Sequence, residues 1–206
     1  MSGTAGDPRP SALLLTGGAS RRMGRDKAAI AVDGRPGAVR IAELLTRVAD
    51  PAIEVGPGRS GLAAVTEEEP GGGPLAAVAA GAAELGRRGH RGPALLVACD
   101  LPRLHSLILG LLAGWPGDES VVPVVEGRPQ WLCARVGVSA LAGVGRQVAA
   151  GERRLAALFD LGPVELVDEH GWGGVAEASD FADIDEPSDL VRLGLAAPGA
   201  RLEGGW

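Results

Sequence analysis

The stretch LLLTGGASRRMGRDKAAIAV at residues 13–32 decides the fold, because a short apolar run ends abruptly in glycine and positive charge. Residues 12–16 predict a buried β-strand. Gly17 and Gly18 then allow a tight turn that brings backbone N–H groups close to a ligand. Four cations follow within residues 21–27. Backbone donors surrounded by cations are the chemistry that a triphosphate requires, so the stretch predicts a phosphate-binding loop after a strand.

Neither of two well-known phosphate loops fits this stretch. A P-loop needs G-x-x-x-x-G-K-[ST], but Gly24 is followed by Arg25 and Asp26. The dinucleotide fingerprint G-x-G-x-x-G fails because Ala19 and Ser20 follow the glycine pair. On composition alone, a solvated basic loop without a ligand remains an alternative.

Size and composition exclude several other classes of protein. A chain of 206 residues with 46% hydrophobic residues suits a single domain with a full core. The net charge of −6, the 3% aromatic content and the absence of tyrosine argue against a nucleic-acid-binding module. Cys99 and Cys133 match no metal-ligand spacing and suit a reducing compartment. No run approaches the roughly 20 apolar residues that span a bilayer. The N-terminus lacks a signal-peptide pattern. We therefore expect a cytoplasmic protein with no membrane partner.

Short apolar runs alternate with helical patterns along the chain, which predicts βα units and a mostly parallel sheet. We expect strands at residues 12–16, 52–55, 62–65, 94–98, 121–125 and 131–136, with a late strand near 181–184. We expect helices at 39–48, 75–85, 104–112, 138–148 and 155–158, and a last one that starts near Pro187. Residues 11–195 are expected to form one domain, between flexible tails at 1–10 and 196–206.

Two segments of the chain resemble a known family. LTGGASRRMGRDK, at residues 15–27, resembles the signature loop L-A-G-G-x-S-x-R-M-G-x-D-K. This loop belongs to the nucleotidyltransferases that build molybdopterin guanine dinucleotide, and to their wider nucleoside-triphosphate-transferase family. Thr16 stands where the family usually has alanine. EEEPGGGPLAAVAAG resembles the family segment D-x-x-P-G-x-G-P-L-A-G, with Glu67 or its neighbour Glu68 in place of the usual aspartate.

Four later segments extend the resemblance over about residues 11–194. VACDLPRL resembles the strand-end C-D-x-P, which implies that Asp100 is a metal carboxylate. GRPQWLCARV resembles the segment with acceptor contacts around its proline, here Pro129. AGERRLAALF resembles a stretch of the guanylyltransferase branch. DFADIDEPSDL resembles N-x-N-T-P-E-D-L, with Asp183 and Asp185 in place of the two asparagines.

The resemblance implies a three-layer α/β/α, Rossmann-like nucleotidyltransferase fold and Mg²⁺-dependent transfer of GMP from GTP to molybdopterin. It further implies that the product passes to apo-molybdoenzymes or their chaperones. Lys27, Arg22 and Asp100 would be catalytic, and Asp100 and Asp185 would hold Mg²⁺. The implied nucleotide-binding residues are Leu15, Thr16, Gly17, Gly18, Ser20, Lys27, Glu67, Gly73, Pro74, Leu75 and Asp100.

Several alternatives remain open at this point. Asp100 could instead cap a helix that begins near Leu101, and Asp185 could simply favour a helix N-terminus. Trp131 could stack on a pterin or cover the core. Gly56 falls roughly where guanylyl enzymes often carry an asparagine near the base, so a cytidylyltransferase or a transferase for another phosphorylated acceptor remains a rival. A nucleotide-binding regulator without turnover is a further alternative.

Overall fold

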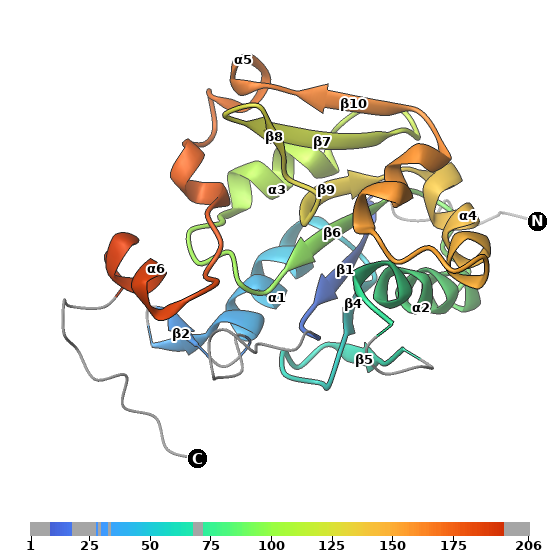
Figure 1. The fold of residues 1–206 in the computed structure, drawn as a ribbon, viewed down its shortest axis with the longest axis horizontal. Helices are drawn as coiled ribbons and strands as arrows, with labels where there is room; N and C mark the ends of the chain where they lie inside the picture. The colour runs from blue at the N-terminus through green and yellow to red at the C-terminus, as the bar shows by residue number, and fades with distance from the viewer. Residues whose placement is uncertain (1–8, 18–27, 29, 33, 68–71, 196–206) are drawn as a thin grey trace, which may run out of the picture.

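A central, mostly parallel β-sheet carries the fold (Figure 1). The computed structural model describes residues 9–17, 28, 30–32, 34–67 and 72–195. The strands stand in the order β10-β7-β9-β6-β1-β4-β5, and β9 runs antiparallel to both of its neighbours. The strands of this sheet are β1 (Ser11–Leu15), β4 (Ala52–Val55), β5 (Ala63–Val65), β6 (Ala94–Ala98), β7 (Ser120–Val125), β9 (Cys133–Val136) and β10 (Val164–Val167).

Short strands lie outside this order. β8 (Arg128–Pro129) pairs with the end of β7 in an antiparallel hairpin. β2 (Ala31–Val32) and β3 (Arg35–Pro36) form a separate antiparallel pair next to the start of the first helix.

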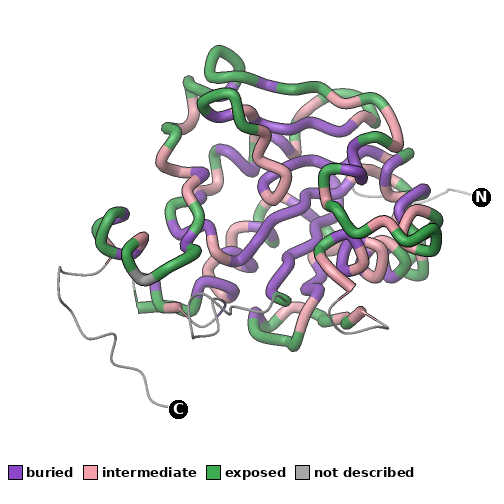
Figure 2. The backbone as a smooth tube through the Cα atoms, in the orientation of Figure 1, coloured by how far each residue is buried: buried purple, intermediate pink, exposed green. Residues whose placement is uncertain are grey.

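Helices cover both faces of the sheet, which confirms the three-layer α/β/α fold (Figure 1). α1 (Gly37–Val48) and α3 (Ser106–Ala113) pack in one apolar cluster. α2 (Pro74–Arg87) and α4 (Val138–Ala149) pack in the other. Successive residues of a strand point to opposite faces, so Leu14 belongs to the first cluster and its neighbour Leu13 to the second. Figure 2 shows the central strands buried between the two helical layers.

The central strands read as unbroken apolar runs because both of their faces are covered. All five residues of β1 are buried, and so are all five of β6. Helix α2 comes especially close to β1 at Gly81, where a Cβ atom would lie only 2.7 Å from a methyl carbon of Leu13. A glycine in mid-helix therefore sets the distance between this helix and the sheet.

The last third of the chain is built from short elements. The 3₁₀ helix η2 (Leu155–Leu161) leads into β10, and α5 (Glu169–Trp172) follows that strand. A second 3₁₀ helix, η3 (Ala178–Phe181), precedes α6 (Pro187–Arg192). Among the described residues, no helix is both long enough and apolar enough to cross a bilayer.

Most of the predicted elements are confirmed. The late strand near 181–184 is wrong, because this region begins with η3 and continues outside any strand. Reciprocal hydrogen bonds between Glu177 and Asp180 cap η3 and favour a helical turn over an extended chain. No prediction covered β10, whose residues are largely exposed at a sheet edge, or the single-turn helix α5. The two-residue strands β2, β3 and β8 and the short helix η3 were not predicted either. Pro187 occupies the first turn of α6, as predicted.

Candidate active site

The carboxyl ends of β1 and β6 meet at one edge of the sheet. These strands are parallel neighbours with Leu15 opposite Ala98, and the backbone N–H of Cys99 donates to the carbonyl of Leu15 across 3.1 Å. The chain that leaves β1 goes on to β4 on one side of this pair, whereas the chain that leaves β6 goes on to β7 on the other side. In open α/β sheets a ligand binds where the connections diverge in this way, so this edge is the candidate site.

The predicted phosphate-binding loop starts at this edge. Leu15 and Thr16 are buried, and Gly17 is exposed. The remaining predicted residues of the loop lie outside the described part of the chain: Gly18, Ser20, Arg22 and Lys27. At the first end of the loop, Thr16 and Gly17 leave the sheet next to the segment that carries Asp100.

A buried carboxylate that the sequence analysis missed lies behind the start of this loop. Glu54, on β4, has no exposed surface, and its carboxylate accepts a hydrogen bond of 2.5 Å from the Thr16 hydroxyl. Its oxygens also accept the backbone N–H groups of Gly58, Arg59 and Ser60 at 2.7–2.8 Å. The Ser60 hydroxyl donates to it at 2.6 Å. One buried side chain therefore joins the loop after β1 to the loop after β4.

The predicted G-P-L turn forms the start of α2. Gly73 precedes the helix with a φ of +89°, a conformation that favours glycine, and Pro74 occupies the first turn. Leu75 is fully buried in the core, so its side chain anchors the start of this helix and does not reach a ligand. Gly73 also lies against Arg153: a Cβ atom there would be 3.5 Å from the arginine carbonyl oxygen. The fold thus brings the G-P-L and A-G-E-R-R segments together.

Glu67 lies at the end of a groove between α2 and α4. The groove, of about 530 Å³, is lined largely by alanine and glycine, with Arg87 and Arg153 among its few charged residues. One carboxylate oxygen of Glu67 is buried and makes no hydrogen bond to any described residue. Residues 68–71, including the alternative Glu68, lie outside the description.

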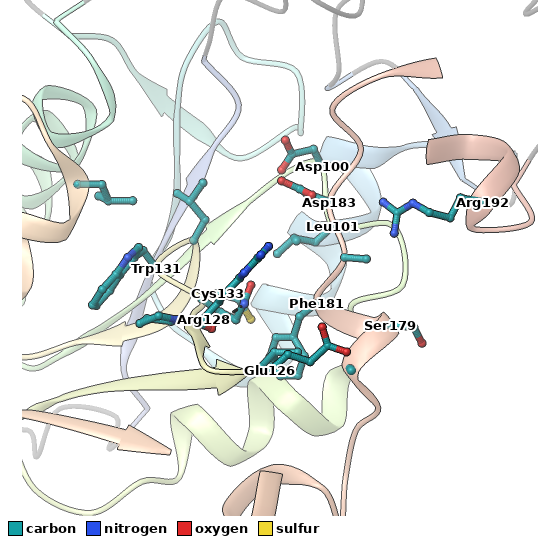
Figure 3. Close-up of a pocket in the computed structure, with 17 residues that line it drawn as sticks. Asp100, Leu101, Glu126, Arg128, Trp131, Cys133, Ser179, Phe181, Asp183 and Arg192 are labelled. Atoms are coloured by element: carbon teal, nitrogen blue, oxygen red, sulfur yellow. Dashed lines mark hydrogen bonds between the residues drawn. The ribbon is translucent and has the colours of Figure 1, made fainter. Parts of the chain in front are cut away.

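Asp100 follows β6 directly and does not cap a helix. The next helix, α3, begins at Ser106 and has His105 at its N-cap, so the capping alternative for Asp100 is wrong. The carbonyl of Asp100 accepts the N–H of Ile184 at 3.0 Å, which draws the C-terminal segment alongside. Asp100 and Asp183 consequently line the same cavity and lie at one end of it (Figure 3).

Asp185, the second predicted metal ligand, is not among the residues that line this cavity. It is exposed, and its backbone N–H donates to Asp189 at 2.8 Å at the start of α6. The described residues contain no cluster of three His, Cys, Asp or Glu side chains that could enclose a metal. Two carboxylates at Asp100 and Asp183 are nonetheless a fitting donor set for Mg²⁺, which binds one or two carboxylates and completes its shell with water and phosphate oxygens.

The cavity beside these carboxylates has a volume of about 660 Å³, within the range of small-molecule sites. The hairpin between β7 and β9 forms one wall, with Arg128, Pro129 and Gln130. Trp131 also lines the cavity and packs against Phe159, with ring centroids 4.7 Å apart. The same side chain therefore both covers the core and faces the cavity.

The lining of this cavity also includes a second cation and a thiol. Arg192 contributes a second cation, which pairs with Asp189 at 2.8 Å. Cys133 also lines it, and burial raises the pKa of this thiol to about 12, so the thiol stays protonated. The cavity therefore offers two cations, the aromatic side chains of Trp131 and Phe181, and a protonated thiol at Cys133.

Comparison with known proteins agrees with this geometry. Residues 12–167 match the family described as MobA-like NTP transferase domain. A molybdenum cofactor guanylyltransferase of Rhodobacter capsulatus is 32% identical over 199 residues, which cover 89% of this chain and 94% of the relative. A probable molybdenum cofactor guanylyltransferase of Mycobacterium tuberculosis is 33% identical over 172 residues, or 78% of this chain and 84% of the relative.

A solved structure shows the same fold. The crystal structure of molybdopterin-guanine dinucleotide biosynthesis protein A from Archaeoglobus fulgidus superimposes with a TM-score of 0.71 at 21% identity. The match covers 89% of this chain and 96% of that one. The chain therefore belongs to the MobA-like NTP transferase family and is a nucleotidyltransferase similar to the molybdenum cofactor guanylyltransferases.

Proposed function

We propose that this protein transfers GMP from GTP to molybdopterin in a Mg²⁺-dependent reaction that releases pyrophosphate. The observation that carries the proposal is the shared position of Asp100 and Asp183 beside the start of the glycine-rich loop, next to a cavity of cofactor size. The names of the relatives support the two substrates.

In the proposed reaction the protein positions two phosphorylated substrates and neutralises their charge. An oxygen of the acceptor phosphate attacks the α-phosphorus of GTP, the bond from that phosphorus to the β-phosphate oxygen breaks, and pyrophosphate leaves with the electron pair. Such transfers depend on alignment and on electrostatic stabilisation more than on covalent chemistry by the protein. Lys27 and Arg22, in the sequence of the signature loop, would neutralise the triphosphate.

Asp100 and Asp183 would hold the metal ion. Mg²⁺ bound there would offset negative charge on the phosphates. We propose Asp183 as the second ligand in preference to Asp185, because Asp183 lines the cavity with Asp100 and Asp185 does not.

The acceptor would occupy the cavity. Arg128 and Arg192 supply positive charge for its phosphate, and Trp131 offers a flat face to its ring system. The two substrates would then lie side by side, the nucleotide at the carboxyl ends of β1 and β6 and the acceptor in the cavity beside Asp100.

One rival uses the same chemistry with a different base or acceptor: a cytidylyltransferase for the same cofactor, or a transferase for another phosphorylated acceptor. The observation that favours it is Gly56, which has no side chain to contact a base and whose Cα lies against the start of the signature loop. The choice of nucleotide in the following experiment separates the two.

The proposal is tested by equilibrium binding of GTP, CTP, ATP and UTP to the purified protein, each with and without Mg²⁺. We expect Mg²⁺-dependent preference for GTP, and a loss of the Mg²⁺ effect in Asp100→Asn and Asp183→Asn. Asp185→Asn is the matched variant two residues away and discriminates between the two candidate ligands. A preference for CTP would favour the cytidylyl rival. Unchanged Mg²⁺ dependence in Asp100→Asn would show that the metal assignment is wrong.

A further inference from the structure

We infer that Glu54 is a positioning residue of the nucleotide site, which ties the start of the signature loop to the loop after β4. The inference rests on the proposed function, because it assumes that a nucleoside triphosphate binds at the end of β1. Glu54 is fully buried and is not among the residues that line the cavity, so its role would be to hold other residues in place.

The contacts of Glu54 with the described residues are unusually complete for a carboxylate. It accepts five hydrogen bonds from two loops, as described above, all between 2.5 and 2.8 Å. Burial raises the pKa of this carboxyl, but the hydrogen bonds from Ser60, Thr16 and the backbone outweigh burial and hold the pKa below its ordinary value. The carboxylate is therefore ionised at neutral pH and held in place by donors from both loops.

These contacts also determine which loop can bind phosphate. The sequence GPGRSG at residues 56–61 is rich in glycine and contains an arginine, so it resembles a second anion-binding loop in composition. However, the N–H groups of Gly58, Arg59 and Ser60 already donate to Glu54. A triphosphate would have to displace a buried carboxylate to use them. The phosphate-binding role is left to the loop that follows Thr16.

Thr16 connects this network to the signature loop. The family usually has alanine at this position, which carries no hydroxyl, whereas here the Thr16 hydroxyl reaches Glu54. The hydroxyl fits because residue 56 is glycine: a Cβ atom there would lie 2.2 Å from it. The Thr16–Glu54 hydrogen bond therefore requires a glycine at position 56. Together these three residues determine where Gly17 leaves the sheet.

Two hydroxyl donors on opposite sides of the carboxylate permit a matched experiment. Thr16→Val removes the donor on the signature loop, and Ser60→Ala removes a donor on the other loop. Both leave the same carboxylate short of one hydrogen bond. Thr16→Ser keeps the hydroxyl and serves as the rescue variant. The readouts are the Kd for the preferred nucleoside triphosphate with Mg²⁺ and the Tm of each protein.

We expect similar losses of Tm in Thr16→Val and Ser60→Ala, because each removes one hydrogen bond to the same group. We expect nucleotide affinity to fall by about tenfold or more in Thr16→Val alone, because only that variant frees the start of the signature loop, and the hydrogen bond that held it to a charged group is worth about that much. Thr16→Ser should bind within about twofold of the wild type.

Two results would overturn the inference while the proposed function stands: wild-type affinity in Thr16→Val, or equal losses of affinity in Thr16→Val and Ser60→Ala. In both cases the wild type binds nucleotide, and Glu54 has only a structural role. A wild type that binds none of the four triphosphates overturns the proposed function, and with it the link between Glu54 and a nucleotide. The two failures are therefore distinguished by the wild-type titration.

Discussion

Gly56→Ala should disturb both stability and nucleotide binding, because no side chain fits at this position. The backbone of Gly56 has a φ of +150°, where residues other than glycine are strained. The added Cβ atom would lie 2.2 Å from the Thr16 hydroxyl oxygen and 2.9 Å from the backbone nitrogen of Gly17. Both distances are shorter than any ordinary contact, so the start of the signature loop must move.

The size of the effect follows from two contributions. Backbone strain at a positive φ costs about 1–2 kcal/mol for an alanine. Displacement of the Thr16 hydroxyl from the Glu54 carboxylate costs a further 1.5–3 kcal/mol or so, typical of a hydrogen bond to a charged group. The free energy of unfolding should therefore fall by about 2.5–5 kcal/mol, which is a large share of the roughly 5–15 kcal/mol that stabilises a domain.

The assay is urea unfolding of the variant together with titration of the preferred nucleoside triphosphate in Mg²⁺. Gly61→Ala is the matched control, since its φ is +83° but no atom lies within 4 Å of the added Cβ. It should lose only the strain contribution, about 1–2 kcal/mol, and keep its nucleotide affinity. Equal losses of stability in Gly56→Ala and Gly61→Ala, or full affinity in Gly56→Ala, would refute the reasoning.

Three further predictions concern packing, pH and thiol reactivity. Gly81→Ala should lower the free energy of unfolding by about 1–3 kcal/mol through overpacking against β1. Gly86→Ala in the same helix has open space around the added Cβ atom and should raise the free energy of unfolding by about 0.5–1 kcal/mol. Chemical denaturation that gave changes of the same sign for both variants would contradict this packing. The pKa of Glu54 lies below its ordinary value of 4.5 in the folded state, so the ionised carboxylate stabilises the fold above about pH 4.5, and this contribution is lost as the pH falls through the lower folded pKa. In Glu54→Gln the urea midpoint should therefore fall less steeply between about pH 5 and pH 3 than in the wild type. Parallel curves of urea midpoint against pH for the two proteins would argue against this role of the carboxylate. Cys133, with a pKa of about 12, should resist alkylation by iodoacetamide at pH 8 until denaturant is added. Mass spectrometry of the Cys99→Ser variant measures the extent of this alkylation. Rapid labelling of the native protein would contradict the prediction and show that the thiol is accessible.

The sequence predicted the parts of the site that depend on local pattern. A buried strand that ends in glycines has few other interpretations, and an apolar run that ends at Asp100 reads as a strand end in an α/β sheet. The fold class and the alternation of helices and strands follow from the same local periodicity. These predictions needed no knowledge of which strands are neighbours.

The parts that the sequence did not predict depend on contacts between distant residues. Glu54 is one carboxylate in the strand AIEV, and its partner Thr16 lies 38 residues away. Their contact follows from the pairing of β1 with β4, which no local pattern reveals. Asp183 and Asp185 both match asparagines of the family segment, and what distinguishes them is that Asp183 lines the cavity with Asp100 whereas Asp185 does not. The late strand was wrongly predicted because the capping of η3 outweighs the apolar pattern.

The most direct test of the central claim is transfer of label from GTP to molybdopterin. The protein, molybdopterin and Mg²⁺ are incubated with GTP labelled at the α-phosphate, and the products are separated and identified by mass. We predict label in a molybdopterin–GMP product, with one pyrophosphate released for each transfer, and loss of the product in Asp100→Asn. Label that stays in GTP, while a control guanylyltransferase transfers it under the same conditions, would contradict the account.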